Sequence, residues 1–251
     1  MASRPADIEQ TLDLPPGYTL VALREVGDAF VHGCAIASDT GAGTLVWVRR
    51  YDLVEFAVVL EPEEPLLSAR RAFFAGMNAI ADAIAAHCPP EREVSFDWPD
   101  AILFDGGLLG GARLGWPADC AEDEVPSWLV FGIMLRAADM AHVEVVQAAA
   151  GVSLLNEGFG MLDTDAIIGS FARHLMTAFD LWGERGFETI ARDYLARLQS
   201  RKAGERRRID LSGDLLITQP TGAGPPERAS LVDALNKAAW YDPQARGPKL
   251  G

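Results

Sequence analysis

The residue types best suited to binding a small molecule lie in one stretch, Ser95–Trp116, which reads SFDWPDAILFDGGLLGGARLGW. Asp97 and Asp100 carry carboxylates that could bind a ureido or amine group. Arg113 could bind a carboxylate or phosphate through two parallel hydrogen bonds. The Gly110-Gly111 pair interrupts an apolar run, and glycine inside a strand indicates a bulge or a close approach of the backbone to another group. The stretch therefore has the chemistry of a ligand-binding hairpin.

Each of these residues also has a purely structural interpretation. Arg113 is equally typical of a solvated strand residue, and this is the simpler interpretation. Asp100 follows Pro99, so its carboxylate is suited to closing a turn. The glycines could serve tight packing rather than a ligand. The sequence keeps both interpretations open and favours the structural one for Asp100.

A hairpin must position these side chains. The apolar runs Ala101–Phe104 and Leu108–Leu114 flank Asp105-Gly106-Gly107, and an Asp-Gly pair is typical of a type I′ turn because both central residues need a positive φ. Trp98-Pro99 lies directly before the first run, where proline costs no ladder hydrogen bond. We therefore predict two antiparallel strands joined by a tight turn, with Trp98 largely buried.

The spacing of apolar residues predicts the other elements, while Asp28–Ile36 reads equally as a helix or a strand. A chain order of strands first and helices later favours an α+β fold. The predicted strands are Tyr18–Leu23, Thr44–Val48, Val54–Leu60 and Trp128–Ala137, and the predicted helices are Leu66–Ile84, Asp165–Trp182 and Gly186–Leu198.

Composition limits the class of protein. The chain has 251 residues, 49% of them hydrophobic, and a net charge of −14. Such an acidic chain lacks the cations that nucleic acid requires, so no nucleic-acid partner is expected. We also expect no signal peptide and no contact with a membrane, because no apolar run is long enough to span one. The three cysteines show no C-x-x-C spacing, which favours reduced thiols in the cytoplasm and no metal site.

Changes in composition along the chain predict three parts. Residues 1–16 are polar and contain prolines, as expected of a loose N-terminal arm. Residues 17–200 hold the predicted sheet and long helices. A charged linker at Arg201–Arg208 then leads to a small C-terminal domain at 209–251, with a strand at Leu211–Gln219 and a short helix at Leu231–Ala239.

The central stretch resembles biotin protein ligases, which carry a K-W-P-N-D run, a D-G turn and an L-A-G-I-L strand. Asp97–Ala101 stands in place of K-W-P-N-D and Leu109–Ala112 in place of L-A-G-I, while Phe131–Arg136 resembles the family's G-I-G-I-N strand. The likeness extends from about Val21 to about Leu198. It implies the biotin/lipoate A/B protein ligase family and the mixed sheet, packed by helices, of class II aminoacyl-tRNA synthetases and biotin ligases. The ligand-binding residues it implies are Asp97, Trp98, Asp100, Gly110, Gly111, Arg113 and Gly132.

The resemblance also implies a reaction. The family joins biotin or lipoate to a lysine of a carrier domain, usually through an acyl-adenylate, so the implied ligands are ATP with biotin, lipoate or octanoate. Positive charge is needed beside the phosphate and the developing carboxyl charge. The family supplies it from a Gly/Arg-rich loop and from a lysine in the W-P-N-D run or just before I-A-G.

Both sources of charge are altered here. Only five residues separate Val48 from Val54, so the Gly/Arg-rich loop is missing, and Asp97 and Leu108 stand at the two lysine positions. An aspartate about 4 Å from a phosphate would be repelled by several kcal/mol at an effective dielectric near 20. Two hypotheses follow. The first is an enzyme that attaches biotin or lipoate through a rebuilt site. The second is a non-catalytic protein that binds a small acid, an acyl-adenylate or a carrier domain. No catalytic residue is assigned.

A thiol mechanism is the remaining alternative. Octanoyltransferases of the family transfer the acyl group through a cysteine thioester, and Cys34 lies two residues from His32. On a strand the two side chains would share a face. An isolated His and Cys are more often structural, and we favour that interpretation.

Overall fold

The computed structural model describes residues 12–138, 151–159, 164–199, 204–220 and 224–249. Seven strands form one mixed sheet in the order β1-β2-β3-β7-β6-β5-β4. β1 runs parallel to β2 and all other neighbours are antiparallel. The α+β class and the mixed sheet packed by helices are confirmed. Their bounds are β1 Thr19–Leu23, β2 Thr44–Val48, β3 Leu53–Leu60, β4 Val94–Asp97, β5 Ala101–Phe104, β6 Gly107–Gly115 and β7 Leu129–Arg136.

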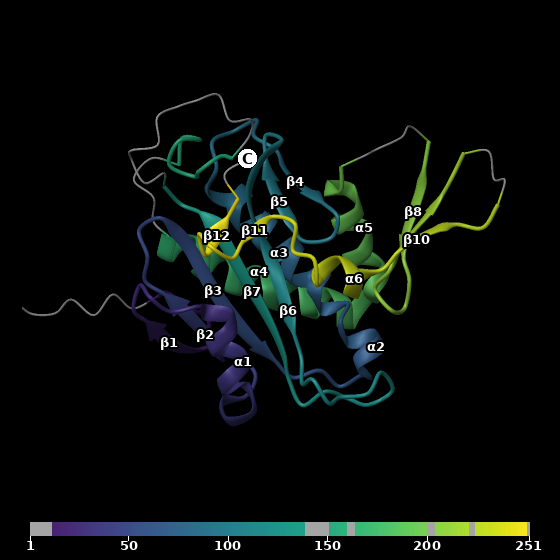
Figure 1. Cartoon of the computed structure of the whole chain (residues 1–251), viewed down its shortest axis with the longest axis horizontal. Coiled ribbons are helices and arrows are strands. Elements are labelled where there is room, and N and C mark those ends of the chain that lie inside the picture. Colours follow the sequence, from purple (N-terminus) through teal and green to yellow (C-terminus); the bar gives the residue numbers. More distant parts are fainter. Residues whose placement is uncertain (1–11, 139–150, 160–163, 200–203, 221–223, 250–251) are drawn as a thin grey trace, which may run out of the picture.

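Helices cover both faces of this sheet (Figure 1). The back face packs against α3 (Ala72–His87) and α4 (Thr164–Arg185), with α5 (Phe187–Arg197) beside them. The front face carries α1 (Ala29–Thr40), so the undecided segment Asp28–Ile36 is helical. The front face is also crossed by the C-terminal residues, drawn in yellow in Figure 1.

The predicted helix Leu66–Ile84 is in fact two helices, α2 (Leu66–Ala69) and α3. Between them the hydrogen bonds tighten to a spacing of three residues, as from Phe73 N–H to the Arg70 carbonyl. The Arg70 guanidinium lies 5.0 Å from the centroid of the Trp116 ring and forms an ion pair with Glu122 of the acidic loop, residues 119–124 between β6 and β7. The break therefore turns a charged side chain out of the helical layer toward that loop.

The main core lies between the back face and the helices. Twelve of the sixteen residues of α3 are buried, which explains why its sequence is apolar on nearly every side. Gly76 lies directly against Phe131 of β7, since a Cβ there would be 2.5 Å from the ring. The Phe131 ring stacks on Phe171 of α4, with 6.0 Å between the centroids. α3 therefore packs against both the sheet and α4.

The predicted hairpin of β5 and β6 is confirmed. Asp105 and Gly106 have φ of 47° and 80°, as a type I′ turn requires. The register shifts between Ile102 and Leu103, so the bulge indicated by the glycines is present. The strand β4, which precedes the Trp98-Pro99 pair, was not predicted.

The C-terminal residues differ from the prediction in several respects. Arg206–Ile209 is a strand, β8, rather than part of a charged linker, and it pairs with β9 (Leu215–Thr218), which pairs with β10 (Glu227–Ala229). The helix predicted at Leu231–Ala239 is shorter, α6 (Leu231–Leu235). The last two strands are β11 (Tyr241–Asp242) and β12 (Gly247–Pro248).

The predicted division of the chain stays a prediction. Ile209, Leu215 and Leu231 are buried in the same core cluster as Phe74 of α3. Of the predicted N-terminal arm, residues 1–11 lie outside the described residues, and Leu12 is buried in that cluster. The alanine-rich segment 139–150 also lies outside them. No helix in the described ranges is both long and apolar enough to cross a bilayer.

Candidate functional site

One row of residues crosses the front face through five strands. The register places Glu55 of β3 opposite Met134 of β7, Met134 opposite Gly111 of β6, and Gly111 opposite Ala101 of β5. Ala101 is in turn opposite Asp97 of β4. Directly paired residues point to the same face of a sheet. Asp97 and Gly111, which lie fourteen positions apart in the sequence, are therefore two strands apart on the front face.

The next row adds the other predicted residues. Arg113 of β6 is paired with Gly132 of β7, which is paired with Ala57 of β3. Since Arg113 follows Gly111 by two positions, both point to the front. Four of the seven predicted residues, Asp97, Gly111, Arg113 and Gly132, thus share this face.

The space in front of both glycines is filled by the protein's own aromatic rings. A Cβ at Gly111 would lie 2.4 Å from the indole of Trp240, and a Cβ at Gly132 would lie 2.8 Å from the ring of Phe30. Trp240 is only 2% exposed and packs with Leu53 and Met134. The short connection between β2 and β3 is confirmed, and α1 and the C-terminal residues cover the front face.

Arg113 is held by a two-point contact with the start of α1. Its Nη1 and Nη2 donate to the two carboxylate oxygens of Asp28 at 3.1 and 3.0 Å. Oδ1 of Asp28 also accepts a hydrogen bond from Val31 N–H and so caps the helix. The guanidinium lies 4.6 Å from the ring centroid of Phe30 and 5.4 Å from that of Tyr241. Arg113 is therefore a fixed, partly buried cation rather than a solvated strand residue.

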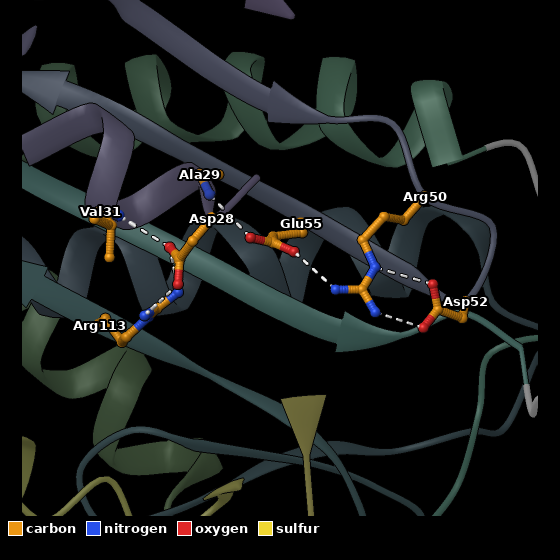
Figure 2. Close-up of polar contacts among 7 residues, drawn as sticks. All are labelled: Asp28, Ala29, Val31, Arg50, Asp52, Glu55 and Arg113. Atoms are coloured by element: carbon orange, nitrogen blue, oxygen red, sulfur yellow. Dashed lines mark hydrogen bonds and ion pairs between the residues drawn. The ribbon is translucent and has the colours of Figure 1, made fainter. Parts of the chain in front are cut away.

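A second charged group lies beside the first on the front face (Figure 2). Glu55, which is 1% exposed, accepts a hydrogen bond from Ala29 N–H at 2.9 Å and lies 3.6 Å from Nη1 of Arg50. Arg50 also donates two hydrogen bonds to Asp52, at 3.0 and 2.7 Å. The short β2–β3 connection thus supplies one cation, and both Asp52 and Glu55 engage it.

The surroundings of Glu55 and Asp52 shift the pKa values of both carboxyl groups. Desolvation raises the pKa of Glu55, while the hydrogen bond from Ala29 and the charge of Arg50 act against the rise. The hydrogen bonds from Arg50 lower the pKa of Asp52. Oε2 of Glu55 is buried without a hydrogen-bond partner among the described residues. An anion placed here would meet Glu55 as well as Arg50.

Asp100 has a different role from the turn closure favoured above. It is 3% exposed, and its Oδ2 accepts a hydrogen bond of 3.0 Å from Nε1 of Trp240. Burial raises the pKa of Asp100 to about 7, although the hydrogen bond from Trp240 opposes the rise. The carboxylate therefore fixes the C-terminal residues onto the hairpin.

The remaining predicted residues lie elsewhere. Trp98 faces the back, where its ring stacks on Phe74 at 6.0 Å and meets Tyr194 at 6.1 Å, and only a minor part of its surface is exposed, as predicted. Gly110 permits a close strand contact, since a Cβ there would lie 2.1 Å from the Met134 carbonyl oxygen. Both residues serve packing.

The thiol mechanism is not supported by the geometry. His32 and Cys34 lie on the helix α1, where residues two apart do not share a face. Burial raises the pKa of Cys34 to about 11, and the charge of Arg113 only partly offsets this. Very little thiolate is present at neutral pH, so Cys34 is a poor nucleophile.

Several residues of this face were not predicted: Asp28, Phe30, Arg50, Glu55 and Trp240. The close approach at Gly111 was indicated by the glycine itself, but the sequence did not show that Trp240 makes it. The number and position of the lysines are one feature of this face that the sequence does show. The chain has three lysines, Lys202, Lys237 and Lys249, and none before residue 202. No lysine of the sheet or of its helices can therefore stand beside a ligand on this face.

Comparisons with known proteins identify the family. The sequence profile of the biotin/lipoate A/B protein ligase family matches residues 14–196, and the chain belongs to this family. A biotin–[acetyl-CoA-carboxylase] ligase of Paracoccus denitrificans is 25% identical over 230 residues, which cover 85% of this chain and 90% of the relative.

Solved structures agree with this assignment. A biotin protein ligase-like protein of unknown function from a Silicibacter species has a TM-score of 0.75 at 25% identity, over 89% of this chain and 99% of the other. The biotin protein ligase of Aquifex aeolicus, solved with biotin and ATP, has a TM-score of 0.60 at 13% identity, over 84% and 95% of the two chains. The second likeness concerns the fold alone.

Proposed function

We propose that the chain binds a small carboxylic acid, or the acyl-adenylate of that acid, on the front face with Arg113 as the principal cation. The observation that supports the proposal is the way in which the Arg113 side chain is held. Asp28 holds one edge of the guanidinium and the rings of Phe30 and Tyr241 lie against it. A guanidinium has five N–H donors in a rigid plane, so donors remain for a carboxylate or phosphate. Gly111 and Gly132 place no side chain of their own beside it.

We further propose that the chain does not form acyl-adenylates in the manner usual for the family. The lysines that the resemblance leads one to expect are replaced by Asp97 and Leu108, and no lysine precedes residue 202. Arg50 in the shortened connection is already engaged by Asp52 and Glu55. Three carboxylates, those of Asp28, Glu55 and Asp97, belong to the same face. A triphosphate would meet these negative charges, and no lysine of the seven-stranded sheet or of α1–α5 compensates them.

Thermal unfolding in the presence of candidate ligands tests the binding proposal. Biotin, lipoate, octanoate, ATP and a non-hydrolysable biotinyl-adenylate analogue are added one at a time, and at least one acid or the analogue should raise the melting temperature. Arg113→Lys keeps the charge but loses the planar fork, so its ligand-induced rise should be smaller than that of the wild type. Arg173→Lys, at a half-exposed position of α4 in the back layer, is the matched control and should keep the full rise. No rise with any ligand would contradict the proposal.

Pyrophosphate release tests the second part. With ATP and each acid, release should stay at the level seen without the acid. Release that depends on the acid would instead favour the ligase hypothesis, with Arg113 beside the phosphate and a carrier-domain lysine as the acceptor. The two measurements together separate a binding protein from an enzyme.

A further inference from the structure

The residues Trp240–Lys249, called here the C-terminal segment, lie across the front face at the candidate ligand site. The indole of Trp240 rests on Gly111, in contact with the backbone of β6. The ring of Tyr241 lies over the guanidinium of Arg113. Toward its end, the carbonyls of Pro248 and Lys249 accept hydrogen bonds from Nη2 of Arg136 on β7. The segment thus covers the front face around Gly111 and Arg113.

The segment reaches this place without becoming part of the large sheet. β11 and β12 pair with each other as a separate two-stranded sheet. Lys249 N–H donates to the Trp240 carbonyl, so that bond too lies within the segment. Among the described residues, its attachments to the large sheet are ring contacts and hydrogen bonds that involve a side chain. The segment can therefore leave the front face without breaking a backbone bond between strands of the seven-stranded sheet.

The charges on the front face indicate which kind of ligand would compete with the C-terminal segment. In a chain of net charge −14, the front face beneath the segment presents two arginines, Arg113 and Arg136. Within the described residues, the segment contacts them through neutral groups, the phenol ring of Tyr241 and the main-chain carbonyls of Pro248 and Lys249. An anionic ligand would interact with the same guanidinium groups more strongly, since a full negative charge adds a Coulomb attraction that a neutral ring or carbonyl lacks.

We propose that the C-terminal segment is an intramolecular competitor of the ligand, which leaves the front face when an acid or acyl-adenylate binds. This inference rests on the proposed function, because it concerns the regulation of that same site. The free chain keeps its face closed, and Trp240 provides the closure.

Hydrogen exchange of the intact chain tests whether the segment detaches. In the free protein, peptides covering 239–249 should exchange at least ten-fold faster than peptides covering β6 and β7. Saturation with the biotinyl-adenylate analogue should speed the exchange of 239–249 further and slow that of β6. Exchange of the segment as slow as that of β6 and β7, and unchanged by the bound analogue, would overturn the inference.

Binding by full-length variants tests the competition. Trp240→Ala should bind the analogue at least ten-fold more tightly than the wild type, and Trp240→Phe, which keeps an aromatic ring but loses part of the indole and the bond to Asp100, should bind several-fold more tightly. Trp182→Ala on α4 of the back layer is the control and should bind as the wild type does. Equal binding by the wild type and both Trp240 variants would overturn the inference and leave the proposed function standing. Binding by none of these proteins would overturn both.

Discussion

Nε1 of Trp240 donates a 3.0 Å hydrogen bond to Oδ2 of Asp100, and the two residues are 140 positions apart in the chain. The bond joins the C-terminal segment to the turn before β5. Asp100 is nearly inaccessible to water, so its carboxylate has exchanged hydration for one indole N–H and the surrounding protein. This pair links the protonation of one carboxyl group to the position of the segment over Gly111.

The first prediction concerns the pH dependence of stability. Because the pKa of Asp100 is raised from 3.8 to about 7, ionisation of this group opposes folding. Its contribution is fully present below about pH 4 and is lost as the pH rises through about 7, with a limit of roughly 4 kcal/mol. Asp100→Asn keeps an oxygen acceptor for Trp240 and removes the ionisation. Denaturant unfolding should therefore show that the variant gains stability over the wild type as the pH rises from 5 to 8.

The control for this experiment is Asp233→Asn, on the short helix α6. Its effect should be independent of pH over the same range. A difference between Asp100→Asn and the wild type that does not change from pH 5 to pH 8 would show that Asp100 titrates normally.

The second prediction concerns the contact between Gly111 and Trp240. A Cβ at Gly111 would lie 2.4 Å from the indole, so Gly111→Ala should force the ring away and cost about 1–3 kcal/mol of unfolding free energy. Gly183→Ala in α4 is the matched control, because nothing lies within 4 Å of a Cβ there. That control should be neutral or stabilising by up to about 1 kcal/mol.

A double-mutant cycle makes the test specific. Trp240→Ala alone should cost about 3–5 kcal/mol, and adding Gly111→Ala to it should cost little more, since the clash is gone. Strict additivity of the two losses would mean that the indole does not rest on Gly111.

What the sequence could predict depends on how far apart in the chain the interacting residues lie. The hairpin could be predicted because Asp105-Gly106 fixes its own backbone, and the buried strands because their apolar residues are contiguous. α1 stayed undecided because Asp28–Ile36 is apolar enough for either structure, and the contacts that settle it, from Arg113 and Glu55, come from two distant strands. β8 was missed because RRRI carries three charges and pairs only through its backbone.

The candidate site could be predicted only in part for the same reason. Gly111, Arg113 and Gly132 were identified from glycines and a cation, which are visible in one stretch or one motif. Their partners, Trp240, Asp28 and Phe30, come from segments that carry no motif. The glycines indicated that something approaches the strands closely, and the structure shows that protein side chains do so.

The third prediction concerns the small C-terminal domain predicted at 209–251. Ile209, Leu215, Leu231 and Trp240 from this region are all buried, and the first three share the core cluster of Phe74. Each buried side chain of this size contributes about 1.5–3 kcal/mol, and together they rival the whole stability of an ordinary domain. A chain ending at Gln199 should therefore fail to give a cooperative thermal transition.

Solubility and circular dichroism of the truncated chain provide the measurement. A soluble protein with a sharp transition close to that of the full chain would establish 209–251 as an independent module. A truncated chain without such a transition would show that the region 209–251 completes the core that contains Phe74.

The last prediction restores positive charge at Asp97. Asp97 lies at the exposed end of β4, in the row that leads through Ala101 to Gly111, and its charge contributes to the raised pKa of Asp100. Asp97→Lys removes a negative charge and adds a positive one on the front face. It should therefore lower the pKa of Asp100 and tighten the binding of the biotinyl-adenylate analogue by roughly 1–3 kcal/mol, the value of a new charge-assisted hydrogen bond. Asp119→Lys in the acidic loop makes the same change in net charge and should leave affinity unchanged. Calorimetric titration of the three proteins decides between a local and a long-range effect. Equal tightening by both variants would assign the gain to net charge alone, and no tightening by Asp97→Lys would show that the bound anion does not lie within reach of β4.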